Sequence, residues 1–296
     1  MATRTIHLSG PVDLRRTLLP LRRGHRDPTT RTEGATVIRA IRTADGAATL
    51  TLRQVGEDLI EADAVGPGAG RALDEAPGLT GALDDPDTFR PRDDVVRELW
   101  RRYRGVRLTR APVLPVLIAA ILEQKVTGAE ARGAWRGLVF ATSERAPGEA
   151  PVWLPPDPDR VAATPSYVFH RFGVEARRAD VVRAVCSRAA RIEGLGSSED
   201  LQTWLRAHRG IGPWTTAETA RLAVGDPDAV SVGDFHLPDL VAWTLAGEPR
   251  ADDARMLELL EPYRGQRGRL QVLLEAGGAT APRYGPRTEI RSIAGL

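Results

Sequence analysis

Two features of residues 204–238 could carry chemistry: a pair of glycines and an acidic residue. A helical pattern leads into Gly210-Ile211-Gly212, a second helical pattern starts directly after it, and Asp234 follows about twenty residues later. Glycine lets the backbone turn tightly and approach another molecule closely. The unpaired N–H groups of such a turn, and of the helix start after it, suit an oxyanion such as a DNA phosphate. The stretch therefore predicts a phosphate site followed by a carboxylate.

Two helices must position the glycine pair. Ser197 or Ser198 is expected to cap the first helix, because a serine hydroxyl accepts a hydrogen bond from the free N–H groups of a first turn. Pro213 is typical of the first turn of a helix, so the second helix is expected to start there. The sequence thus predicts a helix, a short hairpin and a second helix.

The rest of the chain divides into a β-rich part and a helical part. Residues 36–42 alternate in the manner of a strand, Asp45-Gly46 favours a hairpin turn, and strands are expected over 48–53 and 59–65. Further helices are expected over 93–103, 113–124, 175–192, 239–245, 251–261 and 266–276, with one more starting at a capping box of Thr127 and Glu130. We therefore predict a mostly α chain, with an N-terminal α+β domain over 1–88 and an all-helical region over 89–296.

Basic residues of the chain are almost all arginine, and Lys125 is the only lysine among 41 Lys and Arg. Arginine binds phosphate in a bidentate way, so this bias suits a nucleic-acid partner, although a GC-rich genome would give the same bias. The arginines of the predicted 175–192 helix are interpreted mainly as a solvated face: Arg177, Arg178, Arg183, Arg188 and Arg191.

Composition excludes several kinds of site. Cys186 is the only cysteine, and the five histidines show no metal-ligand spacing, which excludes an internal disulfide, a Cys₄ zinc site and an iron–sulfur cluster. The longest apolar run, 113–122, is too short to span a bilayer. The N-terminal residues lack the apolar stretch of a signal peptide, so we expect a cytoplasmic, nucleoid-associated protein with no membrane partner.

Three stretches together resemble one family. They are Gly-Ile-Gly-Pro-Trp-Thr at 210–215, Val-Gly-Asp-Phe-His at 232–236 and Ile-Leu-Glu-Gln-Lys-Val-Thr at 121–127. The chain resembles the helix–hairpin–helix DNA glycosylase superfamily, in its alkylpurine (3-methyladenine type II) branch, sharply over about 118–127 and 204–240. The resemblance implies the helix–hairpin–helix glycosylase fold, with an active-site cleft between two helical subdomains. It also implies that the partner is duplex DNA containing a damaged base, bound by a monomer.

For Asp234 the resemblance implies a catalytic role. Cleavage of an N-glycosidic bond builds positive charge on the sugar, which a nearby carboxylate stabilises while it orients or deprotonates the attacking water. An alkylated purine is already cationic, so its departure needs no second catalytic acid. The base must first be flipped out of the duplex. The alternative interpretation of Asp234 is a turn or helix-capping residue.

Trp214 stands where bifunctional members of the superfamily carry a lysine, whose amine forms a Schiff base with the sugar. Lys125 lies in another segment, so the resemblance implies hydrolysis by water without β-lyase activity. Trp214 would instead stack on the flipped, cationic base. Packing of the tryptophan against the core is the alternative.

Further pocket residues are expected to be Gln124, Glu218 and His236. Glu218 stands where alkylpurine enzymes often carry an aromatic side chain. Its carboxylate would contact a cationic base, or would remain a solvated helix residue. Lys125 holds the position of the wedge that fills the gap left by the flipped base, where an apolar residue is common.

Contacts to DNA are expected from the hairpin and from this wedge: Arg209, Gly210, Ile211, Gly212, Thr215 and Lys125. In the superfamily, main-chain carbonyls of the hairpin also hold a monovalent cation, and by position these belong to Arg206, His208 and Ile211. No other cofactor is implied.

Two other functions stay open. The chain could be a glycosylase for another lesion, such as a deaminated or oxidised base, because Glu218 and Lys125 depart from the family pattern. It could also be a non-catalytic helix–hairpin–helix protein that only grips DNA, although such a module would need neither Asp234 nor the α+β domain.

Overall fold

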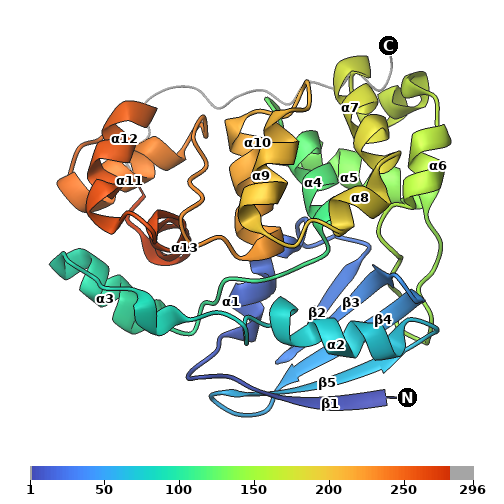
Figure 1. The fold of residues 1–296 in the computed structure, drawn as a ribbon, viewed down its shortest axis with the longest axis horizontal. Coiled ribbons are helices and arrows are strands. Elements are labelled where there is room, and N and C mark those ends of the chain that lie inside the picture. Colours follow the sequence, from blue (N-terminus) through green and yellow to red (C-terminus); the bar gives the residue numbers. More distant parts are fainter. Residues whose placement is uncertain (1, 281–296) are drawn as a thin grey trace.

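The computed structural model describes residues 2–280 and consists of a sheet followed by helices (Figure 1). The sheet is antiparallel, with the strand order β1-β5-β4-β3-β2. Its strands are β1 (Ala2–His7), β2 (Thr30–Glu33), β3 (Thr36–Thr43), β4 (Gly46–Gln54) and β5 (Leu59–Val65). The three strands predicted from the sequence are confirmed, and β1 and β2 are additional. The structure thus begins with the α+β unit that the sequence predicts.

The β3–β4 hairpin turns where Asp45-Gly46 predicted it. Thr43 pairs with Gly46 across the turn, and Gly46 has a φ of 124°, a backbone conformation that favours glycine. Helix α2 (Ala69–Leu79) then packs against β1, β4 and β5. This helix was not predicted, because the Gly66-Pro67-Gly68 stretch before it suggested only a break in structure.

The helical region contains α3 (Asp94–Tyr103), α4 (Val113–Leu122), α5 (Gly128–Thr142), α6 (Pro158–Ala163), α7 (Ala176–Cys186), α8 (Ala189–Glu193), α9 (Ser198–Arg206), α10 (Pro213–Thr219), α11 (Leu237–Ala246), α12 (Asp253–Leu260) and α13 (Arg267–Gly277). Helix α1 (Leu14–Leu18) and the 3₁₀ turn η1 (Leu19–Leu21) lie between β1 and β2. A π-helical turn, η4 (Ala220–Val224), continues α10. Three further 3₁₀ segments of the described chain lie at Pro86–Thr88, Ser166–Phe172 and Glu261–Tyr263.

Local signals placed several helix ends correctly. Ser197 caps α9 by accepting from the Asp200 N–H, and Thr127 and Glu130 form the complete capping box of α5. The prediction of a single helix over 175–192 is wrong, because the chain forms two helices there, α7 and α8, separated around Ser187. Residues 281–296, the end of the predicted helical region, lie outside the described residues.

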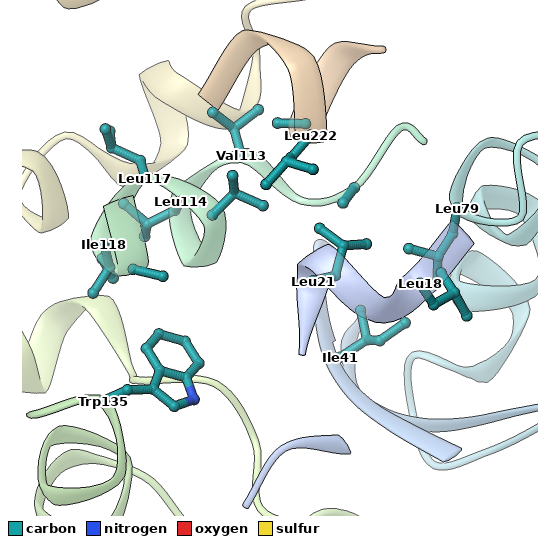
Figure 2. Close-up of a cluster of buried hydrophobic side chains, with 14 of the residues drawn as sticks. Leu18, Leu21, Ile41, Leu79, Val113, Leu114, Leu117, Ile118, Trp135 and Leu222 are labelled. Atoms are coloured by element: carbon teal, nitrogen blue, oxygen red, sulfur yellow. The ribbon is translucent and has the colours of Figure 1, made fainter. Parts of the chain in front are cut away.

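Most buried apolar side chains fall into two clusters. The larger cluster joins the sheet and α2 to α4, α5, α7 and α9, and Figure 2 shows part of it, with Leu21 and Ile41 of the N-terminal unit facing Leu114 and Trp135 of the helical region. The smaller cluster joins α3 to α11, α12 and α13. The helices therefore form two groups, and the chain passes from the first to the second between α10 and α11 (Figure 1).

Among residues 2–280, no helix is long and apolar enough to cross a membrane. The same residues hold no group of three or more His, Cys, Asp or Glu side chains that could bind a metal ion. Cys186 is buried, and burial raises the pKa of its thiol to about 12.

Candidate functional site

The hairpin between α9 and α10 is closed by a hydrogen bond from the Ile211 N–H to the His208 carbonyl, at 3.1 Å. Gly210 has a φ of 93°, which favours glycine, and the Ile211 side chain is buried in the larger core. Gly212 has an ordinary φ of −99° and immediately precedes Pro213, the first residue of α10. The predicted helix, hairpin and helix are confirmed.

Only one glycine of the pair is required by the fold. A Cβ on Gly210 would lie 2.4 Å from Cγ2 of Val181 in α7, whereas a Cβ on Gly212 would meet nothing within 4 Å. The space at Gly212 is open, so no steric contact in the described chain requires a glycine there, although glycine is favoured over alanine at the N-cap of α10. A close approach by another molecule would be a further reason for a glycine.

Gln124 joins the α4–α5 turn to the hairpin. Its side-chain amide donates to the Gly210 carbonyl at 3.0 Å and to the Thr215 hydroxyl at 2.8 Å. The side-chain amide of Gln124, predicted to line a base pocket, therefore bonds to Gly210 of the hairpin and to Thr215 of α10. Thr215 is buried and its hydroxyl accepts from Gln124, and the contact to DNA expected of this residue remains a prediction.

Lys125 follows Gln124 at the tip of the α4–α5 turn. It is exposed, and with a φ of 54° it is the only non-glycine residue of the described chain with a positive φ. Backbone strain of this kind costs about 1–3 kcal/mol and is common at functional sites. The structure thus presents the residue predicted as the wedge in solvent, next to the hairpin that Gln124 contacts.

The Asp234 carboxylate is held by three donors. Its Oδ1 accepts from the N–H groups of His236 and Leu237, at 2.7 and 2.9 Å, where α11 begins. Its Oδ2 accepts from the Trp214 indole N–H at 2.9 Å. The turn interpretation of Asp234 is therefore correct, since the N-cap of α11 is His236, and the second oxygen of Asp234 is at the same time held against α10. Asp234 and Trp214, predicted from separate motifs, are in direct contact.

Glu218 forms a buried ion pair. Both of its oxygens lie within hydrogen-bond distance of Nη2 of Arg221, at 2.8 and 3.0 Å, and its Oε1 also accepts from the Ser231 hydroxyl. The Glu218 and Arg221 side chains are only 14% and 4% exposed. Burial acts to raise the pKa of Glu218, but the Arg221 charge and the Ser231 hydrogen bond outweigh it, and the pKa lies below its usual value. Glu218 is thus neither a solvated residue nor a carboxylate free to meet a base.

Helix α13 contacts the Glu218–Arg221 ion pair from the other side. Oε2 of Glu275 lies 3.3 Å from Nη1 of Arg221, and burial raises the pKa of the Glu275 carboxyl. The Gln271 side chain accepts from the Ser231 N–H at 3.1 Å and donates to the Ser231 hydroxyl at 3.0 Å. We call the set Glu218, Arg221, Ser231, Gln271 and Glu275 the charged bridge.

The charged bridge fixes the stem of the loop that carries Asp234. Ser231 accepts a backbone hydrogen bond from the Asp234 N–H at 3.2 Å, and its side chain contacts both α10 and α13. The charged bridge was not predicted from the sequence. The only local signal was the spacing of Glu218 and Arg221, three residues apart on one helix, which favours an ion pair.

His236 and Phe235 are exposed beside Asp234. The Phe235 side chain is 82% exposed, and its ring stands edge-on to the His236 ring at 4.9 Å. The His236 ring therefore lies at the surface next to the carboxylate, and its predicted pocket role remains a prediction.

On the hairpin itself, Arg209 is exposed, as a residue expected to contact DNA should be. The His208 ring stacks on Trp204 at 3.6 Å. The His208 carbonyl accepts the Ile211 N–H, which leaves one lone pair of that oxygen for a further partner.

Comparison with known proteins gives a consistent result for the fold. No model of a known protein family matches the chain, and no curated protein matches it. Among solved structures, a 3-methyladenine DNA glycosylase from Archaeoglobus fulgidus is similar, with 15% identity, 92% of this chain and 97% of that chain covered, and a TM-score of 0.78.

Two further structures agree. A protein described as MBOgg1, in complex with a low affinity DNA ligand, has 14% identity, 93% and 94% coverage and a TM-score of 0.71. The Clostridium acetobutylicum 8-oxoguanine glycosylase/lyase has 12% identity, 93% and 96% coverage and a TM-score of 0.70. The predicted fold is confirmed: the chain has the helix–hairpin–helix DNA glycosylase fold, with an antiparallel sheet before the helices.

Proposed function

We propose that the protein is a monofunctional DNA glycosylase that flips alkylated bases out of duplex DNA and hydrolyses their N-glycosidic bonds. One observation carries the proposal: the Asp234 carboxylate is bonded to Trp214, the second residue of the helix that follows the hairpin. A carboxylate and an aromatic ring therefore lie directly beside a hairpin suited to a phosphate. Proteins of the same fold described as DNA glycosylases support this interpretation.

In this mechanism the hairpin binds a phosphate through backbone N–H groups, which fixes the register of the protein on the duplex without reading sequence. Gly212 allows the phosphate to approach, since the space beside its Cα is open. Backbone carbonyls of Arg206, His208 and Ile211 would hold a monovalent cation, which would supply positive charge beside a bound phosphate.

Asp234 acts on the sugar of the flipped nucleotide. Its carboxylate stabilises the positive charge that develops as the base leaves, and it orients or deprotonates the water that attacks the sugar. The three donors on Asp234 keep its carboxylate in place, so little reorganisation is needed when the charge develops. A cationic alkylated purine leaves without a general acid, so one carboxylate suffices.

Trp214 stacks on the flipped base, since a π-face attracts a cationic, electron-poor ring. No primary amine stands at this position to attack the sugar, so water is the nucleophile and the product is an abasic site on an intact strand. The Clostridium acetobutylicum neighbour, described as a glycosylase/lyase, makes this part of the proposal worth testing directly.

The test is release of free base from methylated duplex DNA by the wild-type protein and by Asp234→Asn. Asp13→Asn is a matched control, because Asp13 also accepts a backbone N–H at a helix start, in the N-terminal unit. We expect release by the wild type and the control, and a loss of at least about 100-fold in Asp234→Asn. Equal release by wild type and Asp234→Asn would remove Asp234 from the mechanism.

Two further measurements define the chemistry. Duplexes with 8-oxoguanine or a deaminated base test the lesion class, and release from these alone would replace the alkylated-base proposal. Borohydride trapping tests for a Schiff base, and a covalent protein–DNA adduct would overturn the monofunctional assignment. Failure of the wild-type protein to release any base from the panel would leave only DNA binding.

A further inference from the structure

Residues 22–27 of the N-terminal unit form a loop between η1 and β2 that packs against the helical region. Four of its six residues are basic, Arg22, Arg23, His25 and Arg26, and we call it the basic loop. It contains one acid, Asp27. From the sequence the N-terminal unit was expected only to be a scaffold, and this loop contacts the helical region through Glu123 and Trp135.

Asp27 holds the basic loop in one shape. Its buried carboxylate accepts from the Arg23 N–H at 2.7 Å, from the Thr29 N–H at 2.9 Å and from the Trp135 indole of α5 at 3.0 Å. Gly24 has a φ of 82°, and a Cβ there would lie 2.3 Å from Cδ of Arg132 in α5. The loop is therefore fixed against α5 before any partner binds.

The basic loop reaches the α4–α5 turn. Nη1 of Arg23 lies 3.1 Å from Oε1 of Glu123, whose neighbour Gln124 binds the hairpin. The Arg23 charge also contributes to lowering the pKa of Glu218, beneath the loop that carries Asp234. The N-terminal unit thus contacts the same turn that presents Lys125.

Basic side chains outnumber acidic ones along this contact, where Glu123 is 30% exposed and is paired with Arg23. His25, Arg26, Lys125 and Arg132 are exposed, and within residues 2–280 the last three have no acidic group within 4 Å, although the charge of Arg132 is felt by Glu123. The acid Asp27 is buried, and its carboxylate accepts from four donors. A fixed set of unpaired cations at one edge of the site attracts an extended polyanion.

We propose that the basic loop, with Lys125 and Arg132, binds the sugar–phosphate backbone of duplex DNA beside the segment held by the hairpin. This inference rests on the proposed function only in that the ligand is duplex DNA. Because the contacts are to phosphate, they add affinity and fix orientation but carry no sequence preference. The N-terminal unit is then part of the DNA-binding surface as well as a scaffold.

The test is the salt dependence of duplex binding, measured by fluorescence anisotropy on the full chain between 50 and 200 mM salt, with undamaged DNA. The variants are Arg26→Gln, Arg132→Gln and the double substitution. Arg15→Gln is the matched control, because Arg15 is also exposed, unpaired in the described chain and part of the N-terminal unit, but lies beside Val55 and Gly56 of the β4–β5 turn. The logarithm of the association constant falls with the logarithm of the salt concentration, and each lost phosphate contact makes this slope less steep by about 0.9. It also weakens binding about 8-fold near 0.1 M salt.

We expect both single variants to lower the slope, the double variant to lower it about twice as much, and Arg15→Gln to match the wild type. Arg26 has no partner in the described chain, so Arg26→Gln should leave the melting temperature unchanged. Slopes of Arg26→Gln and the double variant equal to that of the wild type would overturn the proposal. Base release by the wild type with unchanged slopes would reject this inference alone, whereas changed slopes without base release would reject the proposed function alone.

Discussion

Alanine at Gly212 should leave the free protein almost unchanged and weaken its binding to DNA. The backbone there has a φ of −99° and open space beside it, so alanine fits without strain. Loss of unfolded-chain entropy would stabilise the variant by about 0.4–1 kcal/mol. Gly212 is also the N-cap of α10, where alanine is disfavoured by a similar amount, so the two effects nearly cancel.

The expected loss of DNA affinity comes from the phosphate. A Cβ at Gly212 would occupy the space through which a phosphate oxygen reaches the backbone N–H groups, and one hydrogen bond to a charged group would be lost. Such a bond contributes about 1.5–3 kcal/mol, which corresponds to a loss on the order of 10- to 100-fold in affinity.

Alanine at Gly210 should behave differently. Its positive φ would cost about 1–3 kcal/mol, and the new Cβ would contact Val181 at 2.4 Å. We therefore expect Gly210→Ala to destabilise the free protein. Adding Val181→Ala removes the contact and should recover part of the loss, while the backbone term remains.

Urea unfolding and anisotropy on a plain duplex measure the two quantities separately. Gly70→Ala in α2 is a control, because its Cβ also meets nothing within 4 Å and lies far from the hairpin in the fold. It should stabilise the protein slightly and leave DNA binding unchanged. If Gly212→Ala keeps wild-type affinity and salt slope, the hairpin does not hold a phosphate at this glycine.

Three further variants probe the contacts around the hairpin. Gln124→Ala leaves the Gly210 carbonyl and the Thr215 hydroxyl without their donor, so the free energy of unfolding in urea should fall by about 1–3 kcal/mol. An unchanged unfolding midpoint would contradict this role. Trp214→Phe keeps a ring but removes the donor to Asp234, so single-turnover base release should slow about tenfold or more with little change in duplex affinity. The pKa of Glu218 lies below its usual value because Arg221 and Ser231 outweigh the effect of burial. Ionised Glu218 therefore stabilises the fold at any pH above its unfolded pKa of about 4.3. This stabilisation is lost as the pH falls through the lower pKa of the folded state. Glu218→Gln should destabilise the protein at pH 7 and reduce the acid dependence of its unfolding; parallel pH profiles would reject the pairing.

Features set by a few neighbouring residues could be predicted from the sequence. Asp45-Gly46 located a hairpin, Thr127 and Glu130 located the start of α5, and Pro213 located the start of α10. In each case the side chain or the allowed φ of a residue satisfies its own local backbone, so no distant partner has to be known.

Features set by distant partners could not. β1 pairs with β5, with Ala2 opposite Ala64, and such a pairing has no signal within either strand. Arg178 was interpreted as part of a solvated face, but it is buried and donates to the Leu122 carbonyl at 2.7 Å, at the end of α4.

The same limit applies within the candidate site. Asp234, Trp214 and the hairpin were found because each has a recognisable local motif. The environment of Glu218 depends on Ser231 and on Gln271 and Glu275 of α13, and no spacing along the chain brings these together. The candidate site residues could therefore be located from the sequence more readily than the residues that support them.

The contact of Gln124 with the hairpin has a consequence for how the molecule opens locally. Gln124 joins the α4–α5 turn to Gly210 and Thr215, and α7 touches both parts, through Arg178 at the end of α4 and Val181 at Gly210. These segments should therefore exchange their amide hydrogens as one cooperative unit. The conformational entropy of the turn and the hairpin is then lost when the protein folds and not when it binds DNA. DNA therefore binds to a surface that is already ordered.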